Sequence, residues 1–296
     1  MNPRNIPFLT AAHIDCLTLA NNHILDWGYS GLKETLETLE KANLKAAGAG
    51  RNLKEAEAPA VMEVKGKGRV IVFSFGSATS GIPFDWAASK GKPGLNLLGE
   101  LSPSSVRKIG EKVLAVKKRG DLVVASIHWG GNWGYGIPPA QTEFTHGLID
   151  VAGVDVVHGH SSHHVKAVEV YQGKLILYGC GDFLNDYEGI SGYEDFRGDL
   201  ALMYFPSLDP STGGVVSLAM TPLQTRRFRL NRASRADAEW LRDTLTREGE
   251  KFGTRVRLES EQTLSLVWDE TGEGRPSQGD CAERALRRSE TTEAIS

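Results

Sequence analysis

The chain has 296 residues, 40% of them hydrophobic, which is enough for one large domain with its own core. Its formal net charge of −3 argues against a dedicated nucleic-acid-binding protein, because such proteins usually carry a strongly basic face. No apolar stretch approaches the roughly 20 residues that a membrane-spanning helix needs, and the first residues lack the long apolar core of a secretory signal.

Short apolar runs predict the strands. Gly66-Lys67-Gly68 and Gln172-Gly173 each separate two such runs, which indicates two β-hairpins. Residues 122–127 are rich in β-branched side chains without polar alternation, which is typical of a central strand. In chain order, the expected strands cover residues 15–20, 60–64, 69–74, 122–127, 154–157, 165–171, 174–178, 200–205, 215–221, 255–258 and 264–268.

Helical spacing of apolar residues predicts the helices between these strands. Ser30 is the expected N-cap of the first, Ser102-Pro103 begins the second, and a third covers residues 139–151. Ser234 is expected to cap the last helix, with Asp237 three residues on as a variant of the capping box.

Parallel β-α-β units and antiparallel hairpins therefore occur in one chain. This mixture favours an α/β fold with a mixed sheet, or two packed sheets with helices outside, over a pure doubly wound sheet. We expect one domain over residues 1–269, with a helix and strands over 232–269 at its end. Residues 270–296 are polar and rich in Gly, Ser, Glu and Arg, so we expect a disordered tail there.

Three polar clusters follow expected strands, at residues 20–26, 127–132 and 157–164. Glycine-rich loops at the ends of buried strands are where α/β folds place functional sites. The third cluster holds four of the eight histidines within seven residues, and neutral imidazole is a common ligand for Zn, Mn and Fe. His160 and His163 are close enough in sequence to reach a common metal pair. The alternative is a loop of exposed or backbone-bonded histidines.

The second cluster contributes His128, whose alternative reading is a core histidine bonded to a carbonyl. The aromatic residues beside it, Trp129, Trp133 and Tyr135, are expected either to form a substrate-stacking rim or to pack under the loop.

In the first cluster, the amide oxygen of Asn22 is an acceptable ligand for a divalent ion. His23 can protonate a leaving oxygen, and Asp26, three residues further on, can orient it. The alternative is that the Asn and Asp residues only form turn and cap contacts before the helix.

Together these clusters resemble the CapA branch, linked to poly-γ-glutamate capsule biosynthesis, of the calcineurin-like metallophosphoesterase superfamily. The resemblance covers roughly residues 8–230 and rests on three blocks in order: LANNHILDWGYSGL at 19–32 followed by AGAGRNLKEAEAP at 47–59, SIHWGGNWGY at 126–135, and HGHSSHHVKAVEVYQGKLILYGCGDF at 158–183. It implies mixed sheets packed as a sandwich flanked by helices, in four α/β/β/α layers.

The resemblance also implies site residues. Asn22, His128, His160 and His163 match the family's metal ligands, and His23, oriented by Asp26, matches its catalytic position. Two divalent transition-metal ions, Mn, Fe or Zn, are expected to polarise a phosphate-like group. Ser161 and Ser162 separate His160 from His163, a departure from the superfamily spacing that the CapA branch shares. Asp182 stands where the branch usually has Asn, so its role is open.

The family begins with a strand ending in Gly-Asp, and that strand has no counterpart among the 20 residues before Asn21. We expect either a fragment of a longer gene product or a start assigned too late, with the first strand missing. As the chain is written, we expect a cytoplasmic protein; the expectation fails if an export signal precedes Met1.

Three functions follow as hypotheses. The first is a metal-dependent phosphoesterase-like enzyme acting on a small-molecule or polyglutamate-type substrate. The second is a non-catalytic component that binds polymer or capsule-synthesis partner proteins. The third is an inactive truncated remnant.

Overall fold

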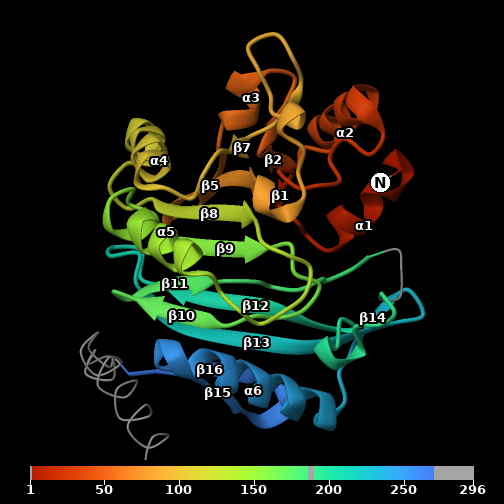
Figure 1. Cartoon of the computed structure of the whole chain (residues 1–296), viewed down its shortest axis with the longest axis vertical. Coiled ribbons are helices and arrows are strands. Elements are labelled where there is room, and N and C mark those ends of the chain that lie inside the picture. Colours follow the sequence, from red (N-terminus) through yellow and green to blue (C-terminus); the bar gives the residue numbers. More distant parts are fainter. Residues whose placement is uncertain (1, 186–189, 270–296) are drawn as a thin grey trace, which may run out of the picture.

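Two sheets of different construction dominate residues 2–185 and 190–269, the part of the chain that the computed structural model describes (Figure 1). In spatial order, the seven-stranded sheet consists of β10 (Val168–Tyr171), β11 (Lys174–Leu177), β9 (Val156–His160), β8 (Leu122–His128), β5 (Gly68–Ser77) and β4 (Ala60–Val64), with β7 (Leu97–Leu98) paired to β5. The five-stranded sheet consists of β12 (Leu200–Leu208), β13 (Val215–Arg226), β16 (Leu264–Trp268) and β15 (Thr254–Leu258), with β14 (Arg229–Arg232) paired to β13.

The larger sheet is mixed, as the sequence predicts. Strands β5, β8, β9 and β11 run parallel, whereas β4–β5 and β10–β11 are antiparallel hairpins at its two ends. The five-stranded sheet is antiparallel throughout. Two small sheets join β1 (Cys16–Thr18) to β2 (Lys45–Ala47) and β3 (Ala49–Gly50) to β6 (Gly94–Leu95). The expected strand at 15–20 is therefore shorter than predicted.

Helices cover these sheets. Helices α4 (Pro103–Val116) and α5 (Pro139–Asp150) pack on the larger sheet through a cluster that includes Val106, Phe144 and Ile127. Helix α6 (Arg235–Gly249) contributes Leu241 and Leu245 to a second cluster, which also contains side chains from both sheets. Helix α2 (Gly28–Lys41) buries Leu32, Leu36 and Leu39 in a third, while α1 (Ile6–Ala11) and α3 (Leu53–Glu57) are short.

The two predicted helix caps have different outcomes. Ser234 and Asp237 form the full capping box at the start of α6, as predicted. The cap predicted at Ser30 is wrong, because α2 begins at Gly28 and its N-cap is Trp27. The Ser30 hydroxyl instead donates back to the carbonyl of Trp27 at 3.4 Å. The predicted tail at 270–296 lies outside the described residues.

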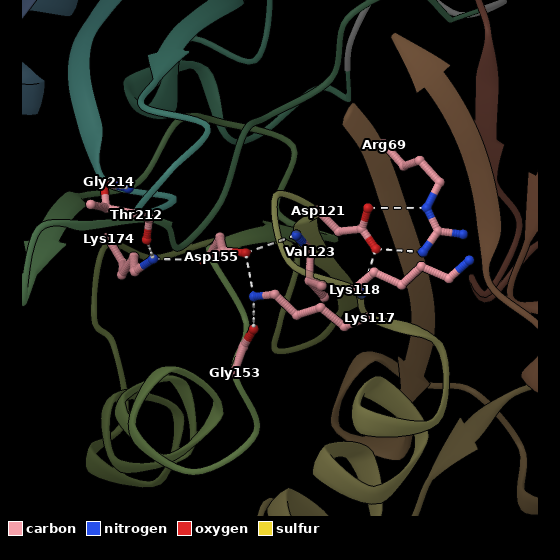
Figure 2. Close-up of polar contacts among 10 residues, drawn as sticks. All are labelled: Arg69, Lys117, Lys118, Asp121, Val123, Gly153, Asp155, Lys174, Thr212 and Gly214. Atoms are coloured by element: carbon pink, nitrogen blue, oxygen red, sulfur yellow. Dashed lines mark hydrogen bonds and ion pairs between the residues drawn. The ribbon is translucent and has the colours of Figure 1, made fainter. Parts of the chain in front are cut away.

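Buried ion pairs fix the amino ends of the central strands (Figure 2). Asp155 directly precedes β9 and accepts from Lys117 Nζ at 2.8 Å, the Val123 amide at 2.9 Å and Lys174 Nζ at 2.5 Å. Asp121 directly precedes β8 and pairs with Arg69 of β5. Both carboxylates are almost fully buried, so these ion pairs cross-link the strands at their amino ends. None of the described helices is both long and apolar enough to cross a membrane.

Candidate functional site at the carboxyl ends of the parallel strands

The second and third predicted clusters meet at one edge of the larger sheet. Gly76 at the end of β5 pairs with His128 at the end of β8, and His128 pairs with His160 at the end of β9. Because these strands are parallel, their carboxyl ends lie side by side, which is where open α/β sheets bind ligands.

Four side chains line one face of β8 and β9 at this edge. Ser126 pairs in register with His158, and His128 with His160, so the period-2 alternation of strands places all four on the same face. That face is opposite α4 and α5, because the intervening Ile127 and Val157 pack with those helices. The Ser126 hydroxyl lies 2.9 Å from His158 Nδ1 and 3.1 Å from His160 Nε2.

The pair at the strand ends, His128 and His160, is the closest contact among the predicted ligands. Their Nδ1 atoms are 3.0 Å apart, and their ring centroids are 5.0 Å apart. His128 is 8% exposed, and its Nε2 is buried without a hydrogen-bond partner in the described part of the chain.

Burial keeps these imidazoles neutral. It lowers the pKa of His128 to about 4, with smaller contributions from the charges of His23 and His163. Burial also lowers the pKa of His158 to about 4 and that of His160 well below its usual value. A neutral imidazole carries the lone pair that a metal ion requires, so the rings are in the ligating form at pH 7.

Gly159 allows this packing because it lies between the two histidines of β9. A Cβ at this position would lie 2.6 Å from the carbonyl oxygen of Tyr178 and 2.8 Å from Trp129 Nε1. Trp129 itself is buried and donates to Tyr178 O at 3.1 Å. Trp129 therefore packs under the loop and does not form a substrate-stacking rim.

The first predicted cluster packs against the end of β5. Ala20 is fully buried, and a Cβ at Gly76 would lie 3.4 Å from its carbonyl oxygen. His23 Nδ1 lies 2.8 Å from Asp26 Oδ2, the pairing that the sequence predicts. The His23 side chain is 70% exposed, and its charge acts on the pKa of His128, so this loop reaches the site.

Asn22 lies in the same loop and is partly exposed. Its side chain makes no hydrogen bond to any residue that the structure describes. Asn21 is the asparagine that forms the turn, because its Oδ1 accepts from the His23 amide at 2.9 Å. The turn-and-cap alternative therefore applies to Asn21 and leaves the amide of Asn22 available.

The remaining two histidines of the third cluster have separate surroundings. His163 Nδ1 lies 3.0 Å and 3.1 Å from the two carboxylate oxygens of Asp182, a partnership that the sequence did not identify. Trp133 packs beside His163 and stacks on Tyr193. His164 is fully buried among aromatic rings, and its Nδ1 contacts the carbonyl of Val165, so His164 follows the backbone-bonded alternative.

The geometry of His128 and His160 is compatible with a shared divalent ion. Nitrogens 3.0 Å apart can both lie about 2.1 Å from a single ion, which is a normal metal–imidazole distance. The carboxylate on His163 is the kind of outer partner that orients a metal-binding histidine. Among the described residues, however, no three His, Cys, Asp or Glu side chains form a metal-binding group.

Comparison with known proteins gives consistent matches. The family described as bacterial capsule synthesis protein PGA_cap matches residues 1–187, which include every candidate ligand and catalytic residue. A probable polyglutamine synthesis accessory protein of Mycobacterium tuberculosis (strain H37Rv) is 47% identical over 268 residues, covering 90% of this chain and 70% of that protein.

Two proteins of Bacillus are more distant relatives. The PGA biosynthesis protein CapA of Bacillus subtilis is 31% identical over 185 residues, covering 62% of this chain and 46% of that protein. The capsule biosynthesis protein CapA of Bacillus anthracis is 33% identical over 171 residues, covering 57% of this chain and 40% of that protein.

Proposed function

Because the chain belongs to the bacterial capsule synthesis family PGA_cap, we propose that it serves the synthesis of a polyglutamate-type capsule polymer together with partner proteins. We further propose a divalent-metal site at the carboxyl ends of β5, β8 and β9 that hydrolyses or transfers a phosphate or related ester. The mixed sheet, the antiparallel sheet and their helices support the calcineurin-like metallophosphoesterase arrangement, with its two sheets as a sandwich in four α/β/β/α layers.

One observation carries the proposal: the buried, neutral Nδ1 atoms of His128 and His160 lie 3.0 Å apart. Without a cation, one ring must donate an N–H to the other, and His128 Nε2 remains buried without a partner among the described residues. A cation between the rings would instead use both Nδ1 lone pairs. Asn22 and His163 are the proposed additional ligands.

When bound, Mn, Fe or Zn would polarise a phosphoryl oxygen and lower the pKa of a bound water. The chain supplies the remaining groups. His23 is exposed at the site, so it can reach a substrate and give a proton to its leaving oxygen. The carboxylate of Asp26 on His23 Nδ1 fixes the tautomer that presents Nε2 outward.

A non-catalytic role is the second candidate. The described residues contain no group of three His, Cys, Asp or Glu side chains placed to hold a metal. A site with neutral ligands holds a doubly charged ion more weakly than one with several carboxylates. A component that binds polymer or partner proteins would need no such ion.

Turnover of p-nitrophenyl phosphate with added Mn²⁺ tests the enzymatic proposal. Wild-type protein should show metal-stimulated turnover, and His23→Ala should reduce kcat by about 10²-fold or more while metal binding is retained. His13→Ala, an exposed histidine outside the site, is the matched control and should change nothing. Wild-type protein without metal-stimulated turnover that still binds polyglutamate would favour the non-catalytic role.

A further inference from the structure

A strongly basic hairpin at the end of the five-stranded sheet is not used by the proposed site. Residues 226–235 contain five arginines and no acidic residue, in a chain whose formal net charge is −3. The hairpin consists of the end of β13, a turn at Arg227-Phe228 and strand β14. In Figure 1, β14 lies on the side of the molecule toward which β8 and β9 point.

The hairpin places like charges face to face. Arg226 and Arg229 are directly opposite each other in the antiparallel register. Cross-strand neighbours have Cβ atoms about 5 Å apart, and like charges in that position are destabilising. The turn residues Arg227 and Phe228, with φ of 53° and 54°, keep the two strands in this tight register.

The described acidic residues do not compensate these charges. Arg226, Arg227, Arg229 and Arg232 make no ion pair with any residue that the structure describes. Other arginines of the same region are paired: Arg197 contacts both Asp199 and Asp237, and Arg235 contacts Glu239. Arg226, Arg227, Arg229 and Arg232 therefore form a local group of guanidinium charges without an ion-pair partner among the described residues.

These cations border a hollow. A cavity of about 530 Å³ is lined by Arg226, Arg227, Arg229 and Asn231. The Asn231 side-chain amide donates to the carbonyls of Gln224, Arg226 and Arg229 at 3.0–3.3 Å. These hydrogen bonds link the two strands of the hairpin beside the hollow. A concave surface with several guanidinium groups suits anionic groups that can enter it.

We propose that this hairpin is a binding site for an extended carboxylate polymer. Guanidinium groups bind carboxylates through paired N–H donors, and a carboxylate between Arg226 and Arg229 would relieve their repulsion. A flexible chain can enter the hollow, whereas the flat surface of an anionic membrane would meet mainly the hairpin tip. The proposal rests on the proposed function only for the identity of the polymer, polyglutamate.

Fluorescence anisotropy with labelled poly-γ-glutamate tests this site on the full chain. Wild-type protein should bind the polymer, and binding should weaken steeply with added salt because it is electrostatic. The double variant Arg226→Gln/Arg229→Gln should weaken binding roughly tenfold or more, since each charge-assisted contact is strong. The control Arg107→Gln/Arg119→Gln removes the same charge from exposed positions in and after α4 and should bind like wild type.

Parallel measurements decide between polymers and other anionic partners. Co-sedimentation with phosphatidylglycerol vesicles that exceeds polymer binding would overturn the proposal in favour of a membrane surface. Stronger binding of a single-stranded oligonucleotide than of the polymer would overturn it in favour of nucleic acid. Equal polymer affinity of the hairpin variant Arg226→Gln/Arg229→Gln and the control variant Arg107→Gln/Arg119→Gln would show that the hairpin is not the binding site. Polymer binding by the wild-type chain should be unchanged in EDTA, which removes divalent ions, so failure of the metal proposal can be told apart from failure of this one. Thermal unfolding checks that the double variant folds.

Discussion

The imidazole rings of His128 and His160 face each other across neighbouring parallel strands, with their Nδ1 atoms 3.0 Å apart. Both rings are neutral at pH 7 because burial lowers the pKa of each. In sequence they are 32 residues apart, and the in-register pairing of β8 with β9 brings them together. The proposed metal site depends on this relationship.

Asp182 is expected to tune metal affinity through His163. Its carboxylate contacts His163 Nδ1 and so orients the imidazole ring. Asp182→Asn should weaken metal binding by about 10- to 100-fold, the usual effect of changing such a partner. Isothermal titration with Mn²⁺ measures it, with Asp85→Asn, an exposed aspartate, as control. Unchanged affinity in Asp182→Asn would remove His163 from the proposed ligand set.

Acid should destabilise the metal-free protein through its buried histidines. The folded-state pKa values of His128 and His158 are about 4, below the ordinary value of 6.5. The unfolded chain therefore takes up protons first, and stability falls as pH decreases from 6.5 toward 4. At pH 5 each of the two histidines should lower the free energy of unfolding by about 2 kcal/mol relative to pH 7.5. Urea unfolding in chelator at the two pH values measures this, and equal midpoints would contradict it.

Asp155 is expected to be a major contributor to stability at the opposite edge of the sheet. Its side chain is 5% exposed and joins Lys117, Lys174 and the Val123 amide. Asp155→Ala should lower the free energy of unfolding by about 3–5 kcal/mol, because it leaves the two lysines uncompensated. Asp243→Ala removes an exposed pair with Arg242 and should cost less than about 1 kcal/mol. Similar losses in the two variants, measured by urea unfolding, would show that the buried network contributes little.

Local patterns predicted much of the fold. The β-branched run of β8, which lacks polar alternation, correctly indicated a central strand, and Val123, Ala125 and Ile127 have no exposed surface. The capping box of Ser234 and Asp237 marked the start of α6, because both of its contacts are local. The start of α2 was misplaced, since Trp27 offers no capping side chain that sequence could identify.

Contacts between distant segments were harder to predict. Asp182 lies 19 residues from His163, and only the folded chain brings the two together. Strand β16 pairs between β13 and β15, an order that hydrophobic patterns do not encode. Ser126 was missed although a signal existed, because its position two residues before His128 in a strand places both on one face.

Isothermal titration calorimetry of the metal-free full chain with Mn²⁺ and with Zn²⁺ is the most direct measurement of the proposed site. Wild-type protein and the exposed-histidine control His13→Ala should bind equally. His128→Ala and His160→Ala should each bind at least roughly tenfold more weakly, since each removes a direct ligand. A wild-type protein that binds neither ion, or a His128→Ala variant that binds as tightly as wild type, would contradict the shared site.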